Sequence, residues 1–68
     1  MVEVFKTNVQ RVKEARMLLN TLIEYFPGHK INFDLSDCDK ILRIEGENVC
    51  PQKIIEVLNA GNYQCMIL

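Results

Sequence analysis

The spacing of apolar residues changes several times along this chain, and these changes limit the fold more than any other feature. Val2 to Lys6 carries the β-branched and aromatic residues of a strand. Apolar residues then recur every three or four positions from Val12 to Phe26, as they do on one face of a helix. His29 to Leu35 alternates strictly between apolar and polar residues, which predicts a half-buried strand, and Lys40 to Glu45 is the predicted returning strand.

The first helix has predicted signals at both ends. Thr7 with Gln10 three residues later matches a capping box, and Asn8 is a second candidate N-cap. The helix must end by Phe26, because Pro27 disfavours the helical conformation of the residue before it. Its predicted buried stripe comprises Val12, Ala15, Leu19, Leu22 and Phe26, widened by Leu18 and Ile23.

A second helix and a last strand follow. Pro51 is expected at the first helical position, where proline is tolerated best. Gly61 fits a C-terminal glycine cap, and Tyr63 to Leu68 is the last predicted strand. The buried stripe of this helix is predicted at Ile54, Ile55, Val57 and Leu58.

The resulting element order is βαββαβ, which we interpret as one domain over residues 1–68. Two interleaved right-handed βαβ crossovers give an α+β fold, the ferredoxin-like two-layer sandwich. Its antiparallel sheet is expected to have the strand order 4-1-3-2, numbered along the chain, with both helices on one face. A chain this short buries only about 60% of the surface that its unfolded form exposes, so we expect no deep cleft.

Several segments resemble the heavy-metal-associated domain of copper chaperones and metal-transporting ATPases. They are Val2-Glu3-Val4-Phe5, the Phe26-Pro27-Gly28 corner, the hairpin from Ile31 to Ile44, and Gly61-Asn62-Tyr63. The resemblance covers nearly the whole chain and implies the same fold. Members of this family bind soft metal ions through a Cys-x-x-Cys pair in the loop before the first helix.

This chain departs from the family at the metal loop. The two cysteine positions hold Asn8 and Arg11 or, with the first helix aligned differently, Val12 and Ala15. None of these side chains offers a thiolate. We therefore expect no metal site in this loop and no cofactor.

Three cysteines and one histidine remain as candidate ligands for a soft metal ion. The topology places Cys38 in a turn at one end of the sheet, Cys50 and His29 at the other end, and Cys65 in an edge strand. Within one subunit Cys38 and Cys65 are not expected to meet, and His29 with Cys50 is the one pair that shares an end. An atypical metal carrier that uses Cys38, Cys50 or Cys65, with its site formed in a dimer, is one alternative hypothesis.

Charge and motifs argue against several functional classes. Eight basic residues are scattered among nine acidic ones, without the clustered Lys and Arg that nucleic-acid binding requires. No nucleophile–base pair, acid–base pair or phosphate loop is found, so we do not expect an enzyme. No segment has the pattern of a signal peptide or a membrane span, and we expect a cytoplasmic protein with free thiols.

Basic side chains near the start of the first helix form a candidate contact surface. Lys6, Arg11 and Lys13, with Arg16, lie where the helix dipole disfavours cations. Such a placement suggests docking of an acidic partner or an anion. The alternative is a solvated surface that Glu14 partly compensates.

The open face of the sheet is a second candidate surface. If Val2 and Val4 point towards the helices, Phe5 points away from them and forms an exposed apolar patch with Ile41 and Met66. Alternatively, Phe5 turns inward through a bulge and the patch is lost. The uncharged segment from Cys65 to Leu68 is suited to pairing with another chain as an edge strand.

These observations predict a non-catalytic interaction module that is similar to a heavy-metal-associated domain without its metal site. It would contact a protein partner, or a second copy of itself, through the sheet face or the last strand. A small-molecule-sensing regulatory domain is a further alternative.

Overall fold

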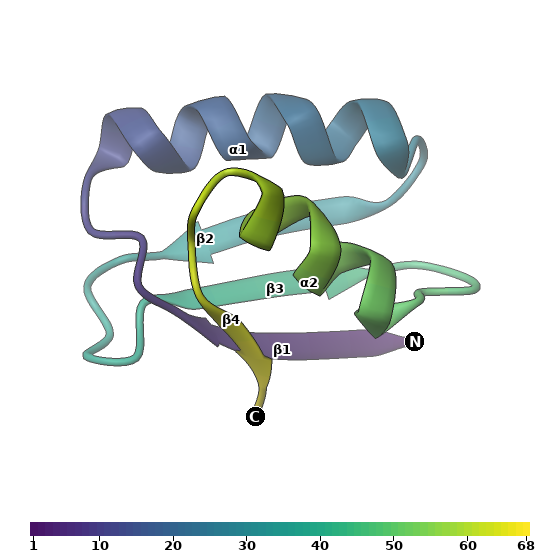
Figure 1. Ribbon diagram of the computed structural model, residues 1–68. Coiled ribbons are helices and arrows are strands. Elements are labelled where there is room, and N and C mark those ends of the chain that lie inside the picture. Colours follow the sequence, from purple (N-terminus) through teal and green to yellow (C-terminus); the bar gives the residue numbers. More distant parts are fainter.

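A four-stranded antiparallel sheet, covered on one face by two helices, makes up the computed structural model of residues 1–68 (Figure 1). The elements are β1 (Val2–Thr7), α1 (Val12–Tyr25), β2 (Lys30–Asp34), β3 (Ile41–Glu45), α2 (Pro51–Ala60) and β4 (Cys65–Ile67). The sheet order is β2-β3-β1-β4, which reads 4-1-3-2 from the β4 edge. The fold is therefore α+β and compatible with a ferredoxin-like arrangement.

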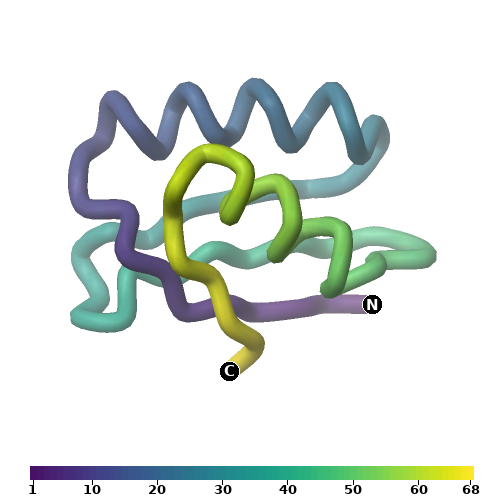
Figure 2. The backbone as a smooth tube through the Cα atoms, in the orientation of Figure 1, coloured from purple at the N-terminus to yellow at the C-terminus, as the bar shows by residue number.

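The connections lie at two opposite ends of the sheet. Figure 2 shows the β1–α1 loop beside the β2–β3 turn, and the α1–β2 corner at the same end as the β3–α2 loop. At the first end, the Thr7 amide donates to the Asp39 carbonyl oxygen over 3.1 Å. At the second end, His29 Nε2 lies 2.8 Å from the Glu47 carbonyl oxygen. A Cβ at position 46 would lie 2.5 Å from the His29 ring, so the contact between His29 and Glu47 requires glycine at this position.

The core lies between the sheet and the helices. Alternate residues of β2 and β3 point into the core, and residues three or four apart point into it from both helices, as the sequence pattern predicts. Val12 and Ile23 differ from the prediction, because both are exposed on α1. The buried apolar residues are Phe5, Val9, Ala15, Leu18, Leu22, Ile31, Leu42, Ile44, Val49, Ile54 and Leu58.

The orientation of β1 is opposite to the one expected. Phe5 is fully buried and pairs with the buried Leu42, so it faces the helices and not the open side of the sheet. The pairing of β1 with β3 is continuous, and no bulge is needed to turn Phe5 inward. Because side chains alternate along a strand, Val2 and Val4 then lie on the open face.

The first helix begins later than the capping pattern predicts. Its N-cap is Arg11, whose amide donates to Glu14 Oε1 over 3.3 Å. Thr7 ends β1 instead, where its hydroxyl donates to the Lys40 carbonyl oxygen and accepts from the Val9 amide. Asn8 accepts from the Gln64 amide over 2.8 Å and joins the β1–α1 loop to the approach to β4. Both cap-type residues therefore hold tertiary contacts.

The end of α2 is capped by asparagine and not by glycine. Gly61 has a φ of −89°, whereas Asn62 has a φ of 69°. The Tyr63 amide donates to the Leu58 carbonyl oxygen and the Asn62 amide donates to that of Asn59. These two bonds form a Schellman motif with Asn62 in the left-handed position.

Candidate interaction surface

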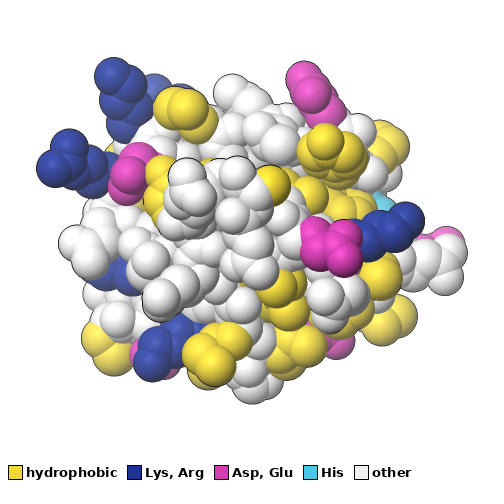
Figure 3. All heavy atoms as spheres, in the orientation of Figure 1, with side chains coloured by type: hydrophobic (Ala, Val, Ile, Leu, Met, Phe, Trp, Pro, Cys, Tyr) yellow, Lys and Arg dark blue, Asp and Glu magenta, His cyan; other side chains and the backbone are white.

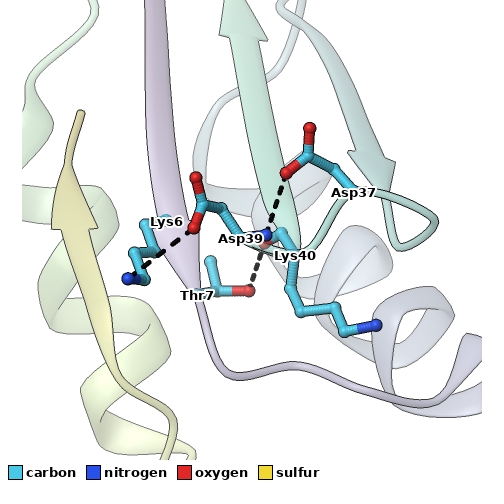
Figure 4. A network of polar contacts seen from close by, with 5 residues as sticks. All are labelled: Lys6, Thr7, Asp37, Asp39 and Lys40. Atoms are coloured by element: carbon cyan, nitrogen blue, oxygen red, sulfur yellow. Dashed lines mark hydrogen bonds and ion pairs between the residues drawn. The ribbon is translucent and has the colours of Figure 1, made fainter.

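A polar network closes the end of the sheet where β1 meets the β2–β3 turn (Figure 4). Thr7 Oγ1 lies 2.6 Å from the Lys40 carbonyl oxygen, and Lys6 Nζ lies 3.6 Å from Asp39 Oδ1. Asp37 Oδ1 accepts from the Asp39 amide over 2.8 Å. Lys40, with a φ of 47°, donates from Nζ to the Leu35 carbonyl oxygen. This network stabilises the turn and anchors it to β1.

The same turn contains the chain's one group of candidate metal ligands. The ligand atoms of Asp37, Cys38 and Asp39 lie within 4.8 Å of one another. Asp37 and Asp39 already take part in the turn, through the backbone hydrogen bond and the contact with Lys6. These contacts account for both carboxylates as residues that stabilise the turn.

The three thiols lie in three different environments. Cys38 is exposed in the β2–β3 turn, and Cys50 is exposed at the N-cap of α2, at the other end of the sheet. Cys65 is partly buried in β4, and desolvation raises its pKa to about 11. At neutral pH this thiol stays protonated, which makes it a poor nucleophile and a poor metal ligand.

The basic residues near α1 do not form a single surface. Arg11, Lys13 and Arg16 are exposed around the start of the helix, and Lys and Arg side chains gather at that end of the molecule in Figure 3. Lys6, however, lies on the open face of the sheet, opposite Ile41 and Met66 in the strand pairing. The sheet separates it from the other three, so the predicted cluster is divided.

The open face carries an apolar strip along β1, β3 and β4. Ile41 and Met66 lie there as expected, and Phe5 does not. Val4 joins them because of the orientation of β1, and Leu68 lies opposite Val4, since its amide donates to the Val4 carbonyl oxygen over 3.0 Å. Met66 is 59% exposed and Leu68 is 63% exposed. We call this set, together with Val2, the open-face strip.

The strip continues to the free edge of β4. The Leu68–Val4 bond sets the alternation of hydrogen bonds in the β1–β4 pair, so Met66 and Leu68 direct their backbone groups towards β1. Cys65 and Ile67 then direct their N–H and C=O groups away from the sheet. No charged side chain occurs from Cys65 to Leu68. This edge is open to pairing with another strand.

A shallow groove of about 540 Å³ separates the C-terminal half of α1 from α2. Tyr25, Phe26 and Val57 contribute apolar walls, and Lys53 and Glu56 contribute opposite charges. Elsewhere, Tyr63 Oη donates to Glu14 Oε2 over 3.0 Å and joins the segment between α2 and β4 to α1. Cys50, at the N-cap of α2, also lines this groove.

No protein-family model matches this chain, and no curated protein matches it. Neither helix has the length and the continuous apolar character needed to cross a membrane.

Proposed function

We propose that this chain is a non-catalytic interaction module of ferredoxin-like fold that binds a protein partner along β4 and the adjoining open face. The open-face strip carries this proposal. It places Val4, Ile41, Met66 and Leu68 on a face that no helix covers, with Lys6 between Ile41 and Met66. Burying apolar surface of this kind favours association by roughly 25 cal/mol for each Å² removed from water.

The chemistry of the β4 edge indicates which partner fits. An extended segment added to β4 would bond to the free backbone groups of Cys65 and Ile67. Its alternate side chains would lie beside Met66 and Leu68, so they should be apolar. Lys6 and Arg43 are exposed on the same face, and each already pairs with an acidic side chain of this chain. They make the margin of the contact polar.

The β1–α1 loop supports a role that does not depend on the metal loop of heavy-metal-associated domains. In this chain the loop is fixed by the contact between Asn8 and the Gln64 amide and by the Thr7 hydroxyl on the Val9 amide. The side chains at the two family cysteine positions are Asn8 and Arg11 or Val12 and Ala15. The resemblance therefore supports the fold and an interaction role, without metal transfer through this loop.

The proposal is tested by a photo-crosslinking residue placed at position 66, with position 20 as the control. Met66 lies in the open-face strip, whereas Asn20 is exposed on α1, on the other side of the sheet. We expect a specific adduct from position 66 alone. The captured protein is then purified, and its dissociation constant is measured with the wild type, with Met66→Lys and with Met17→Lys. Met17 is 64% exposed on α1, so it matches Met66 in exposure.

We expect Met66→Lys to weaken binding at least tenfold, because a charge would be buried against apolar groups. Met17→Lys should leave the dissociation constant unchanged. Equal adducts from positions 66 and 20, or equal losses of affinity in the two lysine variants, would contradict the proposal.

A further inference from the structure

One flank of α1 is apolar, and it is largely exposed at its two ends. Val12, Leu19 and Ile23, with Arg16, are spaced by three or four residues and so share one side of the helix. Val12 is 66% exposed and Ile23 is 48% exposed. The opposite flank faces α2, since Glu14 bonds to Tyr63 and Tyr25 borders the groove beside α2. We call the side with Val12, Arg16, Leu19 and Ile23 the outer flank of α1.

The outer flank lies above β2, which is an edge strand of the sheet. A groove of about 250 Å³ joins them, with Val12 and Leu19 on the helix and Ile31 and Phe33 on the strand. In Figure 1, α1 runs alongside β2 over most of its length. The helix flank and the strand edge therefore form one continuous margin of the molecule.

The backbone of β2 is open on the outer side of this margin. The Gly46 amide donates to the Met1 carbonyl oxygen, which fixes the alternation of hydrogen bonds between β1 and β3. In β3, Arg43 then directs its backbone groups towards β2, where it pairs with Asn32. Ile31 and Phe33 consequently direct their N–H and C=O groups outward, where no strand of this chain meets them.

We propose that a second copy of this chain docks on this margin, with its β2 antiparallel to β2 of the first copy about a two-fold axis through Asn32. Ile31 of each copy then exchanges backbone hydrogen bonds with Phe33 of the other. Lys30 lies directly opposite Asp34 of the second copy, and Asp34 lies opposite Lys30. The result is a continuous eight-stranded sheet with both pairs of helices on one face.

Charge complementarity identifies a second copy as the occupant. Lys30 and Asp34 are both exposed, and neither belongs to the two ion pairs within the chain, Lys6–Asp39 and Arg43–Glu45. Hydrogen bonds from the Ser36 side chain and backbone lower the pKa of Asp34, so its carboxylate is charged at neutral pH. Opposite charges placed across an antiparallel pair stabilise it. A single strand supplies both charges, and the two-fold pairing places each of them opposite its complement.

The outer flank of α1 adds the apolar part of the interface. Because α1 and β2 run in opposite directions, the two-fold axis places the two copies of α1 antiparallel, so that Val12 of one copy lies towards Ile23 of the other. A stable interface buries about 800 Å² on each partner. This area is about a sixth of the 4645 Å² accessible surface of the chain. The five residues of the β2 edge cannot supply it alone, so the interface must include α1.

Charge reversal tests the pairing. Lys30→Glu places a second carboxylate opposite Asp34 of the other copy at both ends of the strand pair, and we expect the dimer dissociation constant to rise about tenfold or more. Asp34→Lys should have the same effect through paired lysines. An equimolar mixture of the two variants restores opposite charges at both ends, and we expect a heterodimer to form. The measurement is sedimentation equilibrium at several concentrations, with native mass spectrometry to distinguish homodimer from heterodimer.

A disulfide tests the register. In a background of Cys38→Ser, Cys50→Ser and Cys65→Ser, Asn32→Cys places two thiols across the axis with Cα atoms about 4.5 Å apart, which a disulfide can span. We expect rapid formation of a covalent dimer on mild oxidation. Lys30→Cys in the same background is the control, because its Cα atoms lie about 13 Å apart, four residues along the strand.

Two outcomes would overturn the inference. One is a wild-type chain that stays monomeric at millimolar concentration. The other is a dimer that Lys30→Glu leaves intact and that Met66→Lys disrupts, since such a dimer forms through β4. The inference is independent of the partner surface proposed above, because Met66→Lys should leave the β2 dimer unchanged.

Discussion

Cys65 is the residue whose environment changes its chemistry most. Burial raises its pKa from 9.0 to about 11, which lowers the thiolate fraction at pH 8 about 100-fold. Because the thiolate is the reacting form, we expect iodoacetamide to modify Cys65 about 100 times more slowly in the folded chain than in the chain unfolded by guanidinium. Mass spectrometry of timed samples measures both rates. Equal rates would show that β4 leaves this thiol open to solvent.

Asn62 carries the left-handed position that ends α2, with a φ of 69°. Asparagine tolerates this conformation, alanine adopts it at a cost of about 1–2 kcal/mol, and glycine adopts it freely. We expect Asn62→Ala to lower the free energy of unfolding by about 1 kcal/mol and Asn62→Gly to leave it unchanged or slightly higher. Urea unfolding followed by circular dichroism gives both values. A ranking with alanine above glycine would contradict the cap assignment.

Among the elements, β1 is the strand whose orientation is easiest to test. Phe5 is fully buried, whereas Val4 lies on the open face. We expect Phe5→Ala to cost about 3–5 kcal/mol, enough to leave a domain of this size largely unfolded. Val4→Ala should cost clearly less, because Val4 is only partly buried and the change removes fewer apolar atoms than Phe5→Ala does. Comparable losses, or the reverse ranking, would mean that β1 faces the other way.

The element scale also shows what the sequence can and cannot predict. β2 is apolar on one face, and β3 has only Ile41 as an apolar residue on its open face, so alternation is enough to assign the buried residues. In β1, both faces carry apolar side chains, from Val2 and Val4 on one face and Phe5 on the other. The sequence pattern therefore does not predict which face is buried. The choice follows from tertiary contacts: Phe5 completes the core against Leu42.

The same limit applies to the start of α1 and to the candidate surface. Thr7 and Asn8 have side chains that can cap a helix, but they form hydrogen bonds with residues far along the chain instead. Ile41 and Met66 are predicted on the open face from β3 alternation and the β4 edge. Val4 and Leu68 are missed, because their placement depends on the orientation of β1.

At the scale of the whole molecule, exposed apolar side chains collect at both margins of the sheet. The β4 margin has the open-face strip, and the β2 margin has the outer flank of α1. The two margins differ in charge. No charged residue occurs from Cys65 to Leu68, while β2 carries Lys30 and Asp34 in self-complementary positions. One margin therefore suits a varied extended partner, and the other suits only a strand with the matching charges.

The stability of the whole fold should fall at alkaline pH. Desolvation and the bond to Glu14 raise the pKa of Tyr63 above 10.0, and burial raises that of Cys65 to about 11. The folded state therefore holds these two protons more tightly than the unfolded chain. This stabilisation is fully present below about pH 9 and is lost as the pH rises through the folded-state pKa values.

We therefore expect these two groups to have no effect on the melting temperature between about pH 7 and 8.5. Above about pH 9, their ionisation should lower the melting temperature steadily. Tyr63→Phe should reduce the alkaline decline, since it removes one of the two titrations, and Tyr63→Phe with Cys65→Ser should reduce it further. Tyr25→Phe, at the exposed tyrosine of α1, controls for the loss of a phenol. Thermal melts at half-unit pH steps measure the profiles. An alkaline decline that is identical in the wild type and the double variant would show that neither group links proton release to unfolding.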